Sequence, residues 1–183
     1  SKYVAPEYVA QLAEDPSKLD LGGRRAHLTI LFSDIRGFTS ISEKMTAHEV
    51  VEFLNEYLSE MAEIVKRSGG TLDKFIGDAV MAFWGEPVRH PDHADRAADC
   101  ALAMRDATAA MRERWAAQGK PDIRIGIGIN TADVVVGNIG SLEHKLDYTV
   151  IGDGVNLASR LEGQNKEFGT TIIVSEFPLE HLG

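Results

Sequence analysis

Long apolar runs are missing from this sequence, although apolar residues make up 44% of its 183 residues. A helix that crosses a membrane needs about 20 consecutive apolar residues, and no stretch approaches that length. The N-terminus also lacks the pattern of a secretory signal peptide.

Cysteine is almost absent from the sequence, which contains a single one, Cys100. One cysteine excludes an internal disulfide bond and is typical of proteins from a reducing compartment.

Positive charge is also scarce in the sequence. It has 19 lysine and arginine residues against 28 aspartate and glutamate residues, which gives a formal net charge of −9. A nucleic-acid groove needs a basic face, so this balance argues against a nucleic-acid partner. An acidic protein can still bind a polyphosphate, but it then needs metal ions or a local basic patch. The length is typical of one globular domain with a proper hydrophobic core.

Apolar patterning and turn signals divide the chain into an N-terminal arm or connector, residues 1–25, and one domain, residues 26–183. Helical spacing predicts long helices over 47–67 and 91–117, and a shorter one from Asp153 to about Glu162. Strands are expected over 28–33, in a hairpin around Gly77-Asp78, in a strand pair around Thr131-Ala132, near 148–151 and at 170–175. Helices that lie between hairpins indicate an α+β sandwich, with a largely antiparallel sheet covered on one face.

Asp34 ends an apolar strand and lies on its apolar side. Side chains alternate along a strand, so Asp34 shares a face with Ile30 and Phe32. A buried carboxylate without a partner costs several kcal/mol, so something is expected to neutralise it. Asp78, in the predicted hairpin turn, is a second carboxylate close to a glycine, where the backbone can approach a ligand. Two carboxylates at one sheet edge suit Mg²⁺ or Mn²⁺, although Asp78 taken alone is more typical of a plain turn residue.

Three further features could bind a phosphorylated ligand. The stretch Ile35–Ser40 leads through a glycine turn to a helix start, where free backbone N–H groups bind phosphate. Asn156 and Arg160 are four residues apart and share one helix face, which suits a ribose and a phosphoryl group. Lys74 shares the parity of Leu72 and Ile76, which places a charge on an apolar face. Each feature also has a plainer explanation, as an ordinary loop, a solvated helix face and a lysine that reaches out to solvent.

Four stretches, taken together, resemble one known family. In chain order they read LFSDIRGFT, LDKFIGDAVMAFWG, INTADVVVGNIGS and YTVIGDGVNLASRLE. They resemble the catalytic domain of the class III nucleotidyl cyclases, and the likeness runs from about Leu28 to Ser175. The resemblance implies a ferredoxin-like sandwich with extensions, which works as a homodimer with nucleotide bound at the interface. It identifies residues 26–183 as the cyclase catalytic domain.

The resemblance also implies roles for individual residues. Asp34 and Asp78, with Ile35 beside them, match the positions that bind two Mg²⁺ or Mn²⁺ ions. Lys74 and Thr149 match the pair that reads the purine. Asn156 and Arg160 match the pair that positions the ribose and stabilises the transition state, and they come from the protomer opposite to the one that supplies the metals. The loop around the triphosphate matches Ile35, Arg36, Gly37, Phe38 and Thr39.

The activity implied by the resemblance is that of an adenylyl cyclase. The ribose 3′-hydroxyl of ATP attacks the α-phosphorus, pyrophosphate leaves, and 3′,5′-cyclic AMP forms. Guanylyl cyclases typically carry Glu in place of Lys74 and Cys in place of Thr149, so this chain is expected to prefer ATP. Many relatives have Asp in place of Thr149, but threonine can still accept a hydrogen bond from the amino group of adenine. The alternatives are a guanylyl cyclase, a cyclase of relaxed purine choice, and a silent nucleotide-binding or dimerisation module.

Other departures from the family pattern concern a turn and the two ends of the chain. Ala132 stands where relatives often have glycine after INT, which predicts a minor variation of a turn. The family usually continues into further strands, one with a lysine that contacts the triphosphate, so a chain that stops at Gly183 is expected either to be truncated or to have low activity. The N-terminal stretch YVAPEYVAQL resembles the segment that joins such domains to upstream sensor modules, often membrane-anchored. A cytoplasmic catalytic domain is therefore expected.

Overall fold

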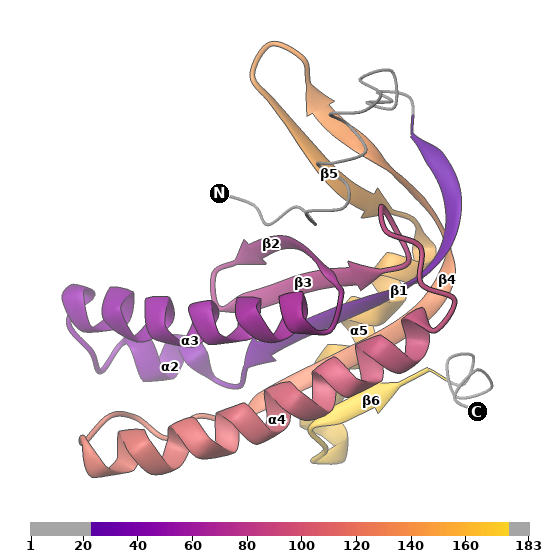
Figure 1. The fold of residues 1–183 in the computed structure, drawn as a ribbon. Helices are drawn as coiled ribbons and strands as arrows, with labels where there is room; N and C mark the ends of the chain where they lie inside the picture. Colours follow the sequence, from indigo (N-terminus) through magenta and orange to yellow (C-terminus); the bar gives the residue numbers. More distant parts are fainter. Residues whose placement is uncertain (1–22, 176–183) are drawn as a thin grey trace.

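The fold is built on a curved six-stranded sheet (Figure 1). The computed structural model describes residues 23–175 of the chain. Strands β2, β3, β1, β4 and β5 are neighbours in that order and antiparallel, and β6 runs parallel to β4. The largely antiparallel α+β architecture expected from the sequence is confirmed. The strands are β1 (Arg24–Ile35), β2 (Thr71–Ile76), β3 (Ala79–Trp84), β4 (Ile125–Ser141), β5 (Lys145–Ile151) and β6 (Ile172–Val174).

Helices cover both faces of the sheet, which corrects the expectation of one covered face. α3 (Ala47–Arg67) and α4 (His93–Ala117) lie on one face, and α5 (Asp153–Phe168) lies on the other (Figure 1). Leu31 of β1 belongs to the core under α3 and α4, whereas Ile30 belongs to the core under α5. Both side chains are fully buried. A strand buried on both faces has apolar residues at both parities, so alternation alone could not reveal the second layer.

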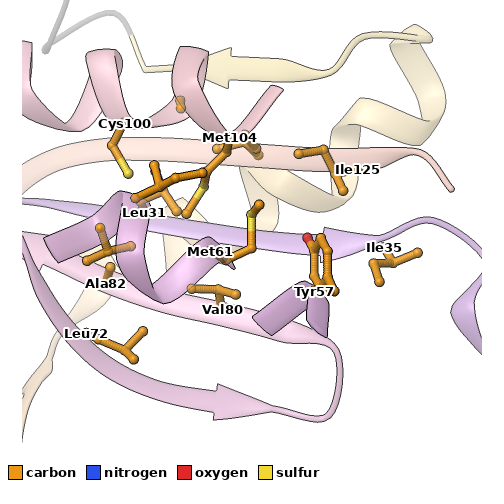
Figure 2. Packing of buried hydrophobic residues seen from close by; sticks show 14 of the residues in the cluster. Leu31, Ile35, Tyr57, Met61, Leu72, Val80, Ala82, Cys100, Met104 and Ile125 are labelled. Carbon is orange, nitrogen blue, oxygen red and sulfur yellow. The ribbon is translucent and has the colours of Figure 1, made fainter. Parts of the chain in front are cut away.

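The larger of the two cores lies between the sheet and the helix pair α3 and α4 (Figure 2). Met61 of α3 and Met104 of α4 meet Leu31 and Val80 of the sheet there, and all four side chains are fully buried. Cys100 is a buried free thiol in the same core. Burial raises the pKa of this thiol to about 12, so it stays protonated and unreactive.

The three main helices follow the sequence pattern at four of their six ends. α3 covers the predicted range and begins with a capping box, in which the Thr46 hydroxyl accepts from the Glu49 N–H at 3.1 Å and the Glu49 carboxylate accepts from the Thr46 N–H at 2.9 Å. α4 ends at the predicted residue but begins at His93 rather than Pro91. α5 is capped by Gly152 and continues beyond Glu162 to Phe168.

The extra length of α5 follows from a buried polar anchor in its last turns. Asn165 is fully buried, and its side-chain amide donates to the carbonyl of Ile127 in β4 at 3.0 Å. This bond ties the end of the helix to the sheet. Gly163 directly follows the predicted end of the helix and is exposed, and a glycine in a helix interior costs only about 1 kcal/mol.

β4 is one continuous strand of 17 residues, which corrects the predicted strand pair around Thr131-Ala132. β1 pairs with it without a break from Ile125 to Val136. The polar residues that suggested a turn are buried instead, and the Thr131 hydroxyl bonds that of Thr29 at 2.7 Å. Ala132 therefore lies inside a strand and not in a turn. It packs against the start of α5, because a methyl group added at Gly154 would lie 2.3 Å from the Ala132 methyl.

The start of the chain is described only from Gly23 onward. Most of the predicted N-terminal arm, residues 1–22, lies outside the described residues. β1 begins at Arg24 rather than Leu28, because Arg24 and Arg25 already pair with Val136 and Val135 of β4. In the part of the chain that the structure describes, no helix has both the length and the apolarity needed to cross a bilayer.

Candidate active site

Asp34 and Asp78 lie together at one end of the sheet. Asp34 is the last residue but one of β1, and Asp78 lies in the turn between β2 and β3. The antiparallel register that pairs Ser33 with Val80 brings the end of β1 beside this turn. The backbone N–H of Ile35 donates to Oδ2 of Asp78 at 2.8 Å and fixes the turn against β1. Two carboxylates from distant parts of the sequence therefore lie close together at this end of the sheet.

The electrostatics of this pair suit a divalent cation. Burial raises the pKa of the Asp78 carboxyl, the hydrogen bond from Ile35 lowers it, and the negative charge of Asp34 raises it again. Carboxylate oxygens are the ligands that Mg²⁺ and Mn²⁺ prefer. Within residues 23–175, no three acidic, histidine or cysteine side chains form a ready-made metal cage. A cation here would take its remaining ligands from backbone, water and phosphate. Mg²⁺ is usually bound in this way, by one or two carboxylates together with water and phosphate oxygens.

Glu162 of α5 is a third carboxylate at this end of the sheet, and the sequence analysis missed it. The pKa of Glu162 is raised to about 8, chiefly by burial and in addition by the contact with Asp34 and its charge, while Lys166 acts in the opposite direction. The helix comes so close because β4 has glycine beneath it. A methyl group at Gly128 would lie 2.3 Å from the backbone nitrogen of Glu162. The stretch IGIGI was the available signal for this close crossing of helix and strand.

The loop after β1 turns through Gly37 into the short helix α2 (Phe38–Ser42). Gly37 has a φ of 64° with open space around it, so the left-handed backbone, not crowding, is what favours glycine here. Phe38 packs on the larger core, whereas Thr39 is exposed. In Arg36, Nε and Nη2 are buried and have no hydrogen-bond partner among residues 23–175. A buried cation of this kind suits an anion that comes from outside the described chain.

Lys74 and Thr149 meet at a residue that the sequence analysis missed, Asp73. The Thr149 hydroxyl donates to Oδ2 of Asp73, and Nζ of Lys74 lies 3.9 Å from Oδ1 of the same carboxylate. The Asp73 side chain is fully buried. β2 and β5 stand at opposite ends of the strand order, so this contact exists only because the curved β4 carries β5 back toward β2 (Figure 1).

The face expected for Lys74 is wrong, and an irregularity in β2 explains the error. The pairing of β2 with β3 shifts register between Leu72 and Lys74, which leaves Asp73 as the extra residue. Alternation therefore does not run through β2. Ile76, which was expected to share an apolar face with Lys74, is 55% exposed.

Asn156 and Arg160 are both exposed on α5. Within residues 23–175 neither side chain makes a hydrogen bond or an ion pair with another described residue. They lie four residues apart and so share one side of the helix. Glu162, which meets Asp34, lies two residues beyond Arg160, or about 200° further around the helix. The face that carries Asn156 and Arg160 is therefore turned away from the Asp34 site of the same chain.

Comparison with known proteins decides the family. Residues 23–180 match the family model described as "Adenylate and Guanylate cyclase catalytic domain". The chain belongs to this family. The recognised motifs and the fold expected from them are confirmed in this cyclase domain, since the chain is similar along most of its length to solved cyclase structures.

Two solved structures show how similar the relatives of this cyclase domain are. The adenylyl cyclase CyaB from P. aeruginosa has 41% sequence identity and a TM-score of 0.82, over 88% of this chain and 83% of that one. The guanylyl cyclase Cya2 has 42% identity and a TM-score of 0.81, over 88% of this chain and 81% of that one. Overall similarity therefore does not choose between the two purines.

Curated relatives of this cyclase domain are longer proteins. Adenylate cyclase 1 of Rhizobium meliloti (strain 1021) is 44% identical over 157 residues, which cover 84% of this chain and 24% of the relative. The adenylate cyclase of Anabaena cylindrica is 36% identical over 187 residues, which cover 99% of this chain and 36% of the relative. The cyclase domain thus spans about a quarter to about a third of the length of these relatives.

Proposed function

We propose that this chain is the catalytic domain of an adenylyl cyclase, which converts ATP to 3′,5′-cyclic AMP and pyrophosphate at sites shared between two copies. The adenylate cyclases of Rhizobium meliloti and Anabaena cylindrica, at 44% and 36% identity, support this activity. Their greater length supports the further proposal that the domain is the output module of a longer signalling protein, joined to an upstream sensor. A domain that uses ATP is proposed to work in the cytoplasm.

The orientation of α5 is the observation that carries the shared site. Glu162 faces Asp34 of its own chain, and Asn156 and Arg160 face away from it. An exposed arginine and amide on a helix face turned away from Asp34 suit a ligand that a second molecule brings to them. A two-fold homodimer supplies such a ligand twice, because each copy then contributes its aspartates to one site and its Asn156 and Arg160 to the other.

The residues around Asp34 divide the work of the reaction. Asp34 and Asp78, beside the backbone of Ile35, would hold Mg²⁺ or Mn²⁺ ions, which supply charge stabilisation for the attacking and leaving oxygens of a phosphoryl displacement. The buried guanidinium nitrogens of Arg36 and the backbone of the Gly37 turn that leads into α2 suit the triphosphate. Across the interface, the Arg160 guanidinium would stabilise charge at the α-phosphate while the Asn156 amide orients the ribose.

The choice of ATP rests on Lys74 and Thr149. An ammonium group donates, so Lys74 matches a ring nitrogen acceptor of adenine. A hydroxyl oxygen accepts, so Thr149 matches the exocyclic amino group. A guanylyl cyclase is the second candidate, because Cya2 is as similar to this chain as CyaB.

Turnover with Mn²⁺-ATP and Mn²⁺-GTP, measured side by side by chromatography of the cyclic products, tests the proposed activity. We expect cyclic AMP as the main product, with kcat/KM for GTP lower by about tenfold or more. Mainly cyclic GMP would make the chain a guanylyl cyclase. Nucleotide binding in calorimetry with no cyclic product from a dimeric sample would make it a silent binding module.

Mixing two inactive variants tests the shared site. Asp34→Asn and Arg160→Ala should each lower turnover by about 10²-fold or more, since each removes charge that acts on the reacting phosphate. An equal mixture should regain about a quarter of the parental activity, because half of the dimers are mixed and each of these has one intact site. Mixing Asp34→Asn with Asp78→Asn is the matched control, since every site in that mixture lacks an aspartate. Failure of the first mixture to regain activity, with mixed dimers shown by differential tags, would place the whole site in one chain.

A further inference from the structure

Asp73 occupies a special place in the purine end of the candidate site. It is the extra residue of the irregularity in β2, it is fully buried, and it touches both purine-reading residues. We infer that Asp73 sets the choice of purine by fixing the direction of the hydrogen bond at the Thr149 hydroxyl. This inference rests on the proposed function and adds a positioning residue to it.

The direction of the hydrogen bond follows from the inventory of protons. A hydroxyl has one proton to donate and two lone pairs to accept with, whereas a carboxylate can only accept. The proton of Thr149 therefore points to Oδ2 of Asp73. What remains for a ligand is the pair of acceptor sites on the Thr149 oxygen. Without Asp73, the hydroxyl could turn and offer its proton instead.

An acceptor at this position distinguishes the two purines. Adenine carries an amino group, a donor, at the ring position where guanine carries a carbonyl oxygen, an acceptor. A hydroxyl held as an acceptor matches the first and leaves the second without a partner. An unpaired polar group in a buried site is penalised more than a matched pair is rewarded, so fixing one proton has a large effect on selectivity.

The contact with Lys74 gives the same carboxylate a second role. Oδ1 of Asp73 lies 3.9 Å from Nζ of Lys74, whose side chain is 37% exposed. The ammonium group has three donors, so it can stay near Asp73 and still donate to a ring nitrogen. That nitrogen is an acceptor in adenine and an N–H donor in guanine. Both readers held by Asp73 therefore match the edge of adenine and mismatch the edge of guanine.

The plainer role for Asp73 is a structural link between β2 and β5. A link of that kind would affect ATP and GTP equally when it is removed. The inference made here predicts instead a change in the ratio of the two. The decisive quantity is therefore kcat/KM for ATP divided by kcat/KM for GTP.

The main variant is Asp73→Asn, which keeps the size of the side chain and gives it an amide donor. The amide can donate to the Thr149 oxygen, so that the hydroxyl proton becomes available to the carbonyl of guanine. We expect the ATP-to-GTP ratio to fall by about tenfold or more, through a lower value for ATP and a higher value for GTP. Competition of the α,β-methylene analogues of ATP and GTP against a fluorescent nucleotide should show the same shift in relative Kd.

Three companion variants identify the route by which Asp73 acts. In a Thr149→Val background, Asp73→Asn should change the ratio by clearly less than it does in the parent, because the hydroxyl is gone and only the contact with Lys74 remains. Asp73→Glu keeps a carboxylate acceptor and should keep the preference for ATP even if total activity falls. Asp133→Asn removes a carboxylate that bonds His27 at 2.8 Å, outside the purine end, and should leave the ratio unchanged.

The outcomes separate this inference from the proposed function. A parental enzyme with no preference for ATP contradicts the proposed substrate and this inference together. A parental preference for ATP that survives in Asp73→Asn, or that falls equally for both nucleotides, overturns only the role of Asp73. Should Asp73→Asn fail to fold in thermal unfolding, loss of the preference in a folded Asp73→Glu variant would overturn it in the same way.

Discussion

The two ends of the candidate site hold carboxylates in different surroundings. At one end, Asp34 and Asp78 are partly exposed and repel each other. At the other end, Asp73 is fully buried and its charge is balanced by contacts with Thr149 and Lys74 of the same chain. Of the first pair, Asp78 accepts the backbone N–H of Ile35 at 2.8 Å. Asp73 receives a hydroxyl proton and lies beside an ammonium group. Asp34 and Asp78 are thus suited to an external cation, whereas Asp73 is suited to contacts within the chain.

The difference teaches how to separate a site built for an external partner from one built for internal order. Repulsion between Asp34 and Asp78 lowers the stability of the metal-free fold, and a bound cation would offset this loss. The contacts of Asp73 stabilise the fold before any ligand arrives and hold Lys74 and Thr149, the proposed purine readers, in place. Substitutions at the first end should therefore affect activity far more than stability, and substitutions at the second end should affect both.

The largest effect is expected for Asp34→Asn. Turnover with Mn²⁺-ATP should fall by about 10³-fold, since a proposed ligand of the catalytic cations is lost. The melting temperature of the metal-free protein should stay the same or rise, because a negative charge beside Asp78 and Glu162 disappears. Turnover and thermal unfolding with a chelator measure the two quantities.

Asp106→Asn is the matched control for this prediction. Asp106 is exposed on α4 and pairs with its neighbour Arg105 at 3.1 Å, so neither activity nor stability should change much. A clear loss of stability in metal-free Asp34→Asn would break the comparison, since it would mean that Asp34 is held by the fold in the way Asp73 is.

A smaller effect, on stability, is expected for Thr149→Val at the other end. The substitution keeps the shape of the side chain but leaves a buried carboxylate without one of its donors. We expect the free energy of unfolding to fall by about 1–3 kcal/mol. Thr108→Val is the control: Thr108 is equally buried, but its hydroxyl donates to the Met104 carbonyl within α4, and its loss should cost about 0.5 kcal/mol. Denaturant unfolding measures the free energy of unfolding of both variants. Equal losses in the two would show that the buried Asp73 carboxylate does not depend on the Thr149 hydroxyl as a donor.

The sequence predicted features that depend on neighbours along the chain. Alternation in β1 correctly placed Asp34 on the side of Ile30, the side that α5 covers. The turn at Gly77-Asp78 and the range of α3 also agree with the structure. These features follow from local rules, namely alternation, turn residues and helix caps.

The features that the sequence did not reveal depend on distant parts of the chain. Asp73 is hidden by a register shift in β2, which no alternation pattern shows. Its partner Thr149 lies on the far edge strand and reaches it only through the curvature of β4. Glu162 meets Asp34 because a glycine in β4 lets α5 approach. In each case the contact is set by packing in three dimensions, which a single sequence specifies but does not display.

The smallest effect sharpens the comparison through pH, at Glu162. In the metal-free protein its pKa is raised from 4.5 to about 8, chiefly by burial, so the folded state binds this proton more tightly than the unfolded state does. The stabilisation is complete below about pH 4.5 and is lost as the pH rises through 8. Glu162→Gln stays neutral and should be more stable than the parent at pH 8.5 by about 1–2 kcal/mol, a value reduced by solvent screening of a partly exposed group.

Glu167→Gln, an exposed change on the same helix, is the control for Glu162→Gln. The raised pKa of Asp78 leaves a weaker slope of the same sign in every variant. Equal slopes of unfolding free energy against pH in the parent and in Glu162→Gln would mean that Glu162 is not part of the repelling group of carboxylates, which would then consist of Asp34 and Asp78.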